Sequence, residues 1–96
     1  MSAELLQQAA QWAQGPQPDR ARPLLARLLD AHPRDADALT VLGIVEQRTG
    51  HTAAALDAFG QAREQDPHNP ARIGNHAVAL KQAGRYDEAI AAFQDQ

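Results

Sequence analysis

Residues 39–67 read LTVLGIVEQRTGHTAAALDAFGQAREQDP, and this stretch decides the fold. It holds two helix-length segments, separated at Gly50 and ended by Asp66-Pro67. Its pattern returns 34 residues away on either side, with small residues on small, large apolar on large apolar and breakers on breakers. The positions in register are Ala21, Ala55 and Ala89; Leu25, Phe59 and Phe93; Pro33 and Pro67; and Gly50 and Gly84. A fixed period of this length is typical of stacked repeats, each of which buries its apolar face against its neighbours.

The composition is that of one small helical domain. The chain has 96 residues, of which 44% are hydrophobic and few are β-branched or aromatic, and this favours helices around a packed core. The net charge is −3 without any basic run, so neither nucleic acid nor an anionic membrane is expected as a partner. The sequence has no cysteine, no signal-peptide pattern and no apolar stretch of about 18 residues, so the default expectation is a soluble cytoplasmic protein.

Caps and breakers predict six short helices in three pairs. Helix starts are expected at Ser2, Asp19, Asp35, Thr52, Asn69 (with Pro70 as the first helical residue) and Asp87. Helix ends are expected at about Gln14, before His32-Pro33, at Gly50, at Asp66-Pro67 and at Gly84, with the sixth helix running to the last residue. Pro23 lies near the start of the second helix and removes one backbone hydrogen bond there.

The third helix differs from the helices on either side of it. Residues 38–45 are apolar nearly all the way round, which predicts a helix buried on more than one side, in the middle of the stack. The second and fourth helices carry a single apolar stripe and are expected to lie outside. In the fourth helix that stripe is Ala55, Leu56, Phe59 and Ala62.

Helix pairs at this period resemble the tetratricopeptide repeat. That family has small residues at the eighth and twentieth positions, an aromatic residue at the twenty-fourth and a proline at the thirty-second. The matching residues are Leu5, Ala9, Trp12, Ala21, Leu25, Leu28 and Pro33 in the first repeat; Leu39, Leu42, Gly43, Ala55, Phe59, Ala62 and Pro67 in the second; and Ile73, Ala77, Gly84, Tyr86, Ala89 and Phe93 in the third. Gly15 stands one place early, which predicts a longer turn inside the first pair.

The resemblance implies an all-α fold, a right-handed α-solenoid of three antiparallel helix pairs. It forms a single domain over 1–96, with repeats at about 2–35, 36–69 and 70–96, the last of them truncated. Small residues such as Gly43 and Ala55 would let paired helices cross closely, and Phe59 would fill the space between layers.

In this family the first helix of each pair lines a concave groove that holds an extended peptide. By that resemblance, the groove-facing residues here are Leu6, Ala10, Val41, Ile44, Gln47, Arg48, Asn75, Val78, Lys81 and Gln82. One subgroup grips a peptide's terminal carboxylate with basic and amide side chains. The matching positions here hold Leu6, Ala10, Val41, Ala71 and Asn75. Four of these five cannot hold a carboxylate, so that clamp is not expected.

The remaining groove is mostly apolar, and we expect it to bind a peptide or partner protein. In this hypothesis Asn75 hydrogen-bonds the ligand backbone through its amide. The alternative is structural: Val41, Ile44 and Val78 pack between repeats, and Asn75 caps or bridges within the stack.

The sequence contains no motif typical of a catalytic, metal-binding or phosphate-binding site. His32, His51 and His68 fall at expected helix ends, and His76 stands where the family has a packing leucine. No histidine pair has the helical spacing of a zinc site, and no nucleophile triad or phosphate loop occurs, so no catalytic residue, metal or cofactor is expected.

The last residues define a second candidate surface. A following helix or another copy of the chain would cover Tyr86, Ala89, Ile90 and Phe93, because an exposed apolar patch commonly marks an interface. Three functions stay open: a protein-interaction module within a larger protein, a non-catalytic N-terminal region that positions the substrate of a larger enzyme, and a homo-oligomerisation module.

Overall fold

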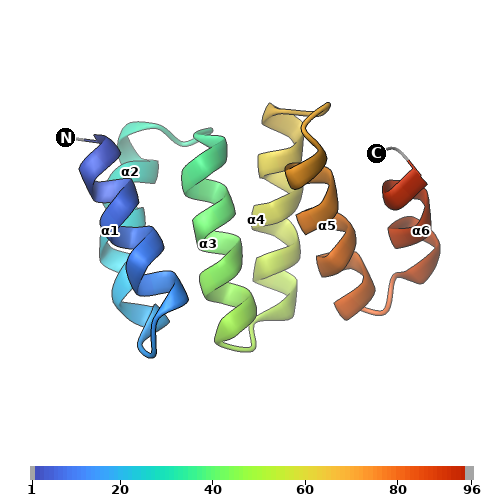
Figure 1. The fold of residues 1–96 in the computed structure, drawn as a ribbon, viewed down its shortest axis with the longest axis horizontal. Coiled ribbons are helices and arrows are strands. Elements are labelled where there is room, and N and C mark those ends of the chain that lie inside the picture. The colour runs from blue at the N-terminus through green and yellow to red at the C-terminus, as the bar shows by residue number, and fades with distance from the viewer. Residues whose placement is uncertain (1, 95–96) are drawn as a thin grey trace.

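The computed structural model describes residues 2–94 and is all-helical within that range (Figure 1). Its elements are α1 (Ser2–Gln14), the 3₁₀ helix η1 (Pro18–Ala21), α2 (Arg22–Ala31), α3 (Ala36–Arg48), α4 (Thr52–Gln65), α5 (Pro70–Gln82) and α6 (Tyr86–Gln94). The six predicted helices are therefore present in three antiparallel pairs. Five helix starts fall within a residue of those predicted, and the second helix is the exception.

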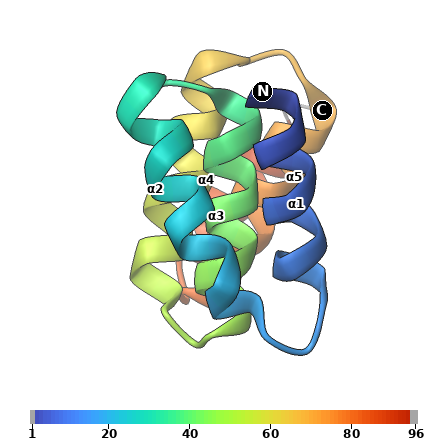
Figure 2. The same cartoon turned by 90° about the vertical axis from the view of Figure 1, so that its left-hand side faces the viewer.

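The pairs stack along one axis in two layers. Figure 2 looks along the stack: α2 and α4 lie on one side, α1 and α5 on the other, and α3 between them. Each second helix packs against the first helix of the next pair, α2 against α3 and α4 against α5. We call these two contacts the first junction and the second junction. The molecule is elongated, with extents of 38 × 25 × 18 Å.

Local sequence explains where most helices begin and end. The carboxylate of Asp35 accepts a hydrogen bond of 3.0 Å from the backbone N–H of Ala38, and Asn69 caps α5 in the same way ahead of Pro70. Gly50 and Gly84 follow α3 and α5 with φ of +82° and +80°, the left-handed conformation that glycine adopts without strain. The prediction that Ser2 caps the first helix concerns a side chain outside the described part of the structure.

The predicted start of the second helix at Asp19 is wrong. Residues Pro18–Ala21 form a 3₁₀ turn, and α2 begins at Arg22. If Asp19 were the cap, Pro23 would occupy the position whose N–H makes the first intrahelical bond, and proline has no N–H. The chain instead places Pro23 in the first turn of α2, where no donor is needed. The longer turn predicted from Gly15 is present.

The core confirms the reason for small residues at helix crossings. A Cβ atom at Gly43 would lie 2.6 Å from the ring of Phe59, which is 3% exposed. Only glycine therefore lets α3 and α4 approach this closely. As predicted, α3 is buried on several sides and packs against α1, α2 and α4.

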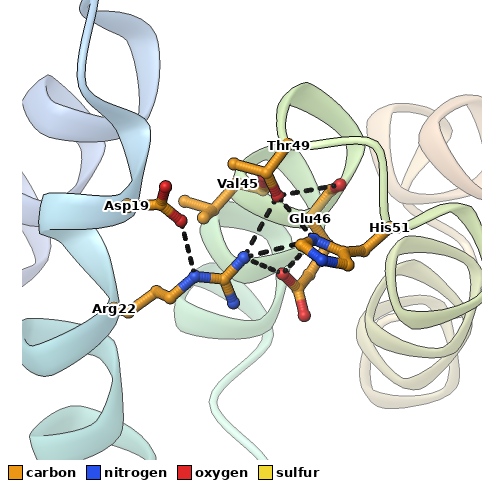
Figure 3. Close-up of polar contacts among 6 residues, drawn as sticks. All are labelled: Asp19, Arg22, Val45, Glu46, Thr49 and His51. Carbon is orange, nitrogen blue, oxygen red and sulfur yellow. Dashed lines mark hydrogen bonds and ion pairs between the residues drawn. The ribbon is translucent and has the colours of Figure 1, made fainter.

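A polar cluster holds the first junction together (Figure 3). Arg22 on α2 forms ion pairs with Asp19 and with Glu46 on α3, and donates 3.1 Å to the hydroxyl of Thr49. His51 Nδ1 lies 2.8 Å from that hydroxyl and 3.7 Å from Glu46 Oε1. Hydrogen bonds with Glu46 and Asp19 raise the pKa of Arg22, so its guanidinium stays charged.

Candidate functional site

The first helices of the second and third repeats, α3 and α5, face one another across a surface that we call the first-helix face. At its N-terminal end, Arg72 of α5 donates a hydrogen bond of 2.9 Å to the hydroxyl of Thr40 and forms an ion pair with Asp37, and both of these partners lie on α3. At its C-terminal end, Gln47 donates a hydrogen bond of 2.7 Å to the side-chain carbonyl of Gln82. Two polar bridges therefore mark the two ends of this face.

Between the bridges lie Ile44, Asn75 and Val78. Ile44 is partly buried against the core, whereas Val78 is 40% exposed. The Asn75 side chain is half-buried and makes no hydrogen bond with any residue in the described range. This part of the face combines apolar contact area with an amide whose donor and acceptor no described residue uses.

The other residues predicted to face the groove lie in varied positions. Leu6 and Ala10 on α1 are partly buried and pack against the first core cluster, and Val41 is 8% exposed within it. Lys81 is exposed. Arg48 bonds the carbonyl oxygens of Ala13 and Gly15, so its cation lies at the C-terminus of α1, where a positive charge is favourable.

Arg72 and its partners on α3 were not predicted from the sequence. A signal existed, because three interactions between successive first helices join residues 35 positions apart: Ala13 with Arg48, Gln47 with Gln82, and Asp37 with Arg72. An offset of one repeat plus one residue therefore identifies the side chains that connect neighbouring repeats.

The C-terminal face of α6 presents three large apolar side chains. Tyr86, Ile90 and Phe93 are 62%, 56% and 45% exposed. Ala89, which was predicted to belong to the same surface, is only 3% exposed, because it packs in a core cluster with Ala77 and Leu80 of α5. The exposed surface therefore consists of the other three residues.

His76 on α5 faces α4 instead of the first-helix face. Its Nδ1 lies 3.3 Å from a guanidinium nitrogen of Arg63, and Nε2 is the atom nearest to the Cβ position of Gly60. Burial lowers the pKa of His76, and the positive charges of Arg63 and Arg85 lower it further. The described residues include no cluster of three His, Cys, Asp or Glu side chains that could hold a metal ion. No helix in residues 2–94 is both long and apolar enough to cross a membrane.

The fold defines a class of protein, the modules built from stacked helical repeats. Comparison with known families then identifies which repeat family the chain belongs to. Two tetratricopeptide repeat profiles match the sequence, one over residues 10–70 and the other over residues 47–96. The chain therefore belongs to the tetratricopeptide repeat family, whose members are interaction scaffolds.

Solved structures named MamA are similar to the chain. A MamA mutant has a TM-score of 0.83 at 24% identity and covers 98% of this chain. MamA MSR-1 has a TM-score of 0.83 at 23% identity, and MamA AMB-1 has 0.82 at 27%, each covering 99% of it. This chain spans 69%, 55% and 52% of those three chains. No curated protein matches the sequence.

Proposed function

We propose that the chain binds an extended or amphipathic segment of a partner protein across the first-helix face, between the two polar bridges. The observation that carries this proposal is the Asn75 amide, which is half-buried and unbonded within the described range. A peptide backbone offers the complementary N–H and C=O groups. Val78 and Ile44 supply apolar contact beside it, which an apolar side chain of the ligand would cover.

Peptides selected from a random library on the wild-type protein test this proposal. We expect Asn75→Ala to weaken their binding about three- to tenfold, because one or two neutral hydrogen bonds are lost. Val78→Asp should weaken it more, since it places a charge in the apolar contact. Gln65→Ala, at an exposed position on α4, is the control and should not change the affinity. Equal affinities for the wild type and both face variants would rule out this face.

Self-association is a second candidate function, favoured by the exposed Tyr86, Ile90 and Phe93 on α6. An isologous contact between two such faces would remove these side chains from water. Light scattering over a concentration series should then show a dimer, and Ile90→Glu should give a monomer. A wild-type protein that stays monomeric at all concentrations would contradict self-association.

A further inference from the structure

A pocket of about 570 Å³ lies at the second junction, away from the first-helix face. Its apolar walls come from Ala53, Leu56, Gly60 and Pro67, and its basic groups are Arg63, His76 and Arg85. This volume is within the range of about 300–1,000 Å³ in which ligand sites fall. The pocket shares no residue with the proposed peptide site, because His76 lies on the side of α5 that faces α4.

The 34-residue register explains why the second junction is open. At the first junction, the equivalents of Ala53, Leu56 and Arg85 are Asp19, Arg22 and His51, the side chains of the polar cluster (Figure 3). Short or apolar residues replace two of these three at the second junction. At the register position of Arg22, which spans the first junction, the second junction therefore has Leu56.

The imidazole of His76 presents a hydrogen-bond donor in this pocket. A guanidinium can only donate, so the contact with Arg63 makes Nδ1 an acceptor and leaves the proton of the neutral ring on Nε2. Nε2 has no hydrogen-bond partner within residues 2–94. Gly60 makes room for the ring, because a Cβ atom there would lie 3.3 Å from Nε2.

The formal charges of the pocket wall balance, with two guanidiniums and two carboxylates, so the wall tolerates one added negative charge beside the guanidiniums. The positive charges of Arg63 and Arg85 both act on His76, and Glu88 and Glu64 act in the opposite sense. Arg85 also forms a bidentate ion pair with Glu88 on α6, so a ligand carboxylate at Arg85 would share this guanidinium with Glu88 or displace it. Asp57 and Glu64 are exposed carboxylates of the same pocket and would repel a run of acidic residues.

We propose that this pocket binds a single acidic side chain, flanked by apolar residues, from a segment of a partner protein. The carboxylate accepts hydrogen bonds from His76 Nε2 and Arg85, and the flanking side chains lie on Leu56 and Pro67. The proposal extends the interaction function to a second surface and does not depend on binding at Asn75.

Nuclear magnetic resonance of the isotope-labelled full chain tests this proposal with three capped peptides, acetyl-Ala-Leu-Glu-Leu-Ala-amide and its Gln and Lys counterparts. We expect the Glu peptide to shift the amide resonances of Gly60 and Arg63 and to bind about tenfold more tightly than the Gln peptide. His76→Leu and Arg85→Gln should each weaken Glu-peptide binding about tenfold. Leucine is the residue at the equivalent position 42, so His76→Leu is compatible with the repeat.

Arg27→Gln is the matched control, because Arg27 is an exposed arginine on α2, away from the pocket. It should leave the affinity unchanged. The proposal fails if no peptide shifts Gly60, if the Lys peptide binds as well as the Glu peptide, or if His76→Leu and Arg85→Gln have no effect. Shifts at Ile44, Asn75 and Val78 alone would also overturn it, while supporting a peptide site on the first-helix face.

Discussion

The two junctions of the solenoid occupy equivalent places in the repeat, but their side chains differ in kind. At the first, Arg22 and Glu46 form an ion pair between α2 and α3. At the second, the same register positions are Leu56 and Leu80, and Leu80 is 3% exposed. The small residues of the repeat fix how closely helices approach, whereas the junction residues determine whether the space beside them is filled.

This difference has an energetic side. An apolar pair such as Leu56 and Leu80 gains stability from burial alone. A partly buried ion pair must recover the cost of removing its charges from water, and either partner left alone is unfavourable. The first junction is therefore sensitive to single substitutions at polar positions, and the second to loss of apolar volume.

Among the variants that test the difference between the two junctions, Leu80→Ala should change the stability most. Deleting most of a buried leucine should lower the free energy of unfolding by about 2–4 kcal/mol, measured by urea denaturation. Val78→Ala, on the same helix but 40% exposed, is the control and should cost less than about 1 kcal/mol. Similar losses for the two variants would mean that α5 is not packed as described.

Glu46→Ala should have the next largest effect and lower the free energy of unfolding by about 1–2 kcal/mol. The Glu46 side chain is 14% exposed and that of Arg22 is 35% exposed, so solvent partly screens the pair. Combining Arg22→Leu with Glu46→Leu makes the first junction resemble the second. Urea denaturation of the single and double variants should show the double variant to be more stable than Glu46→Ala. A double variant with the sum of two separate losses would contradict this account.

His76→Leu should change how stability depends on pH. Folding lowers the pKa of His76 below its ordinary value of 6.5. Above that value the ring is neutral in both states, but as pH falls below it the unfolded chain binds the proton first, so the wild type loses stability. The loss is complete once the pH is below the lowered folded pKa. Urea denaturation between about pH 7 and pH 5 should show that the free energy of unfolding of the wild type decreases relative to that of His76→Leu. The other three histidines are common to both proteins.

Gly60→Ala and Ala26→Gly form the smallest test, because they exchange the residues at one register position. Ala26→Gly should cost about 1 kcal/mol, as glycine does inside an exposed helix. Gly60→Ala should gain less than this, since the new Cβ atom would lie 3.3 Å from His76 Nε2 and the ring must shift. Thermal denaturation of the two variants measures both changes, and equal and opposite values would show that Gly60 makes no room for the ring.

Much of the fold could be predicted, because its determinants are local. Asp35, Asn69 and Gly50 act on the backbone within a few residues, and the 34-residue register places Gly43 opposite Phe59. Asp19 is the predicted cap of the second helix, at the cost of one backbone hydrogen bond at Pro23, whereas the chain avoids that loss by beginning α2 at Arg22. That turn is decided by a missing N–H four residues after the expected cap.

Much of the candidate site could not be predicted. Arg72 and Gln82 reach across from one first helix to the next, and which long side chain makes such a contact depends on the rotation of each helix. His76 was recognised as a residue in a packing position. Its contact with Arg63 and its approach to Gly60 required the three-dimensional arrangement of α4 and α5.

The short range of these contacts has a consequence for how the chain folds. Side-chain hydrogen bonds between the described helices join residues at most 35 positions apart, and helices pack only within a repeat or against the next one. Little loop-closure entropy is lost before such contacts form, so folding in microseconds to milliseconds is expected. Any adjacent pair of helices can form first, and during synthesis the first two repeats can assemble before the third has been translated.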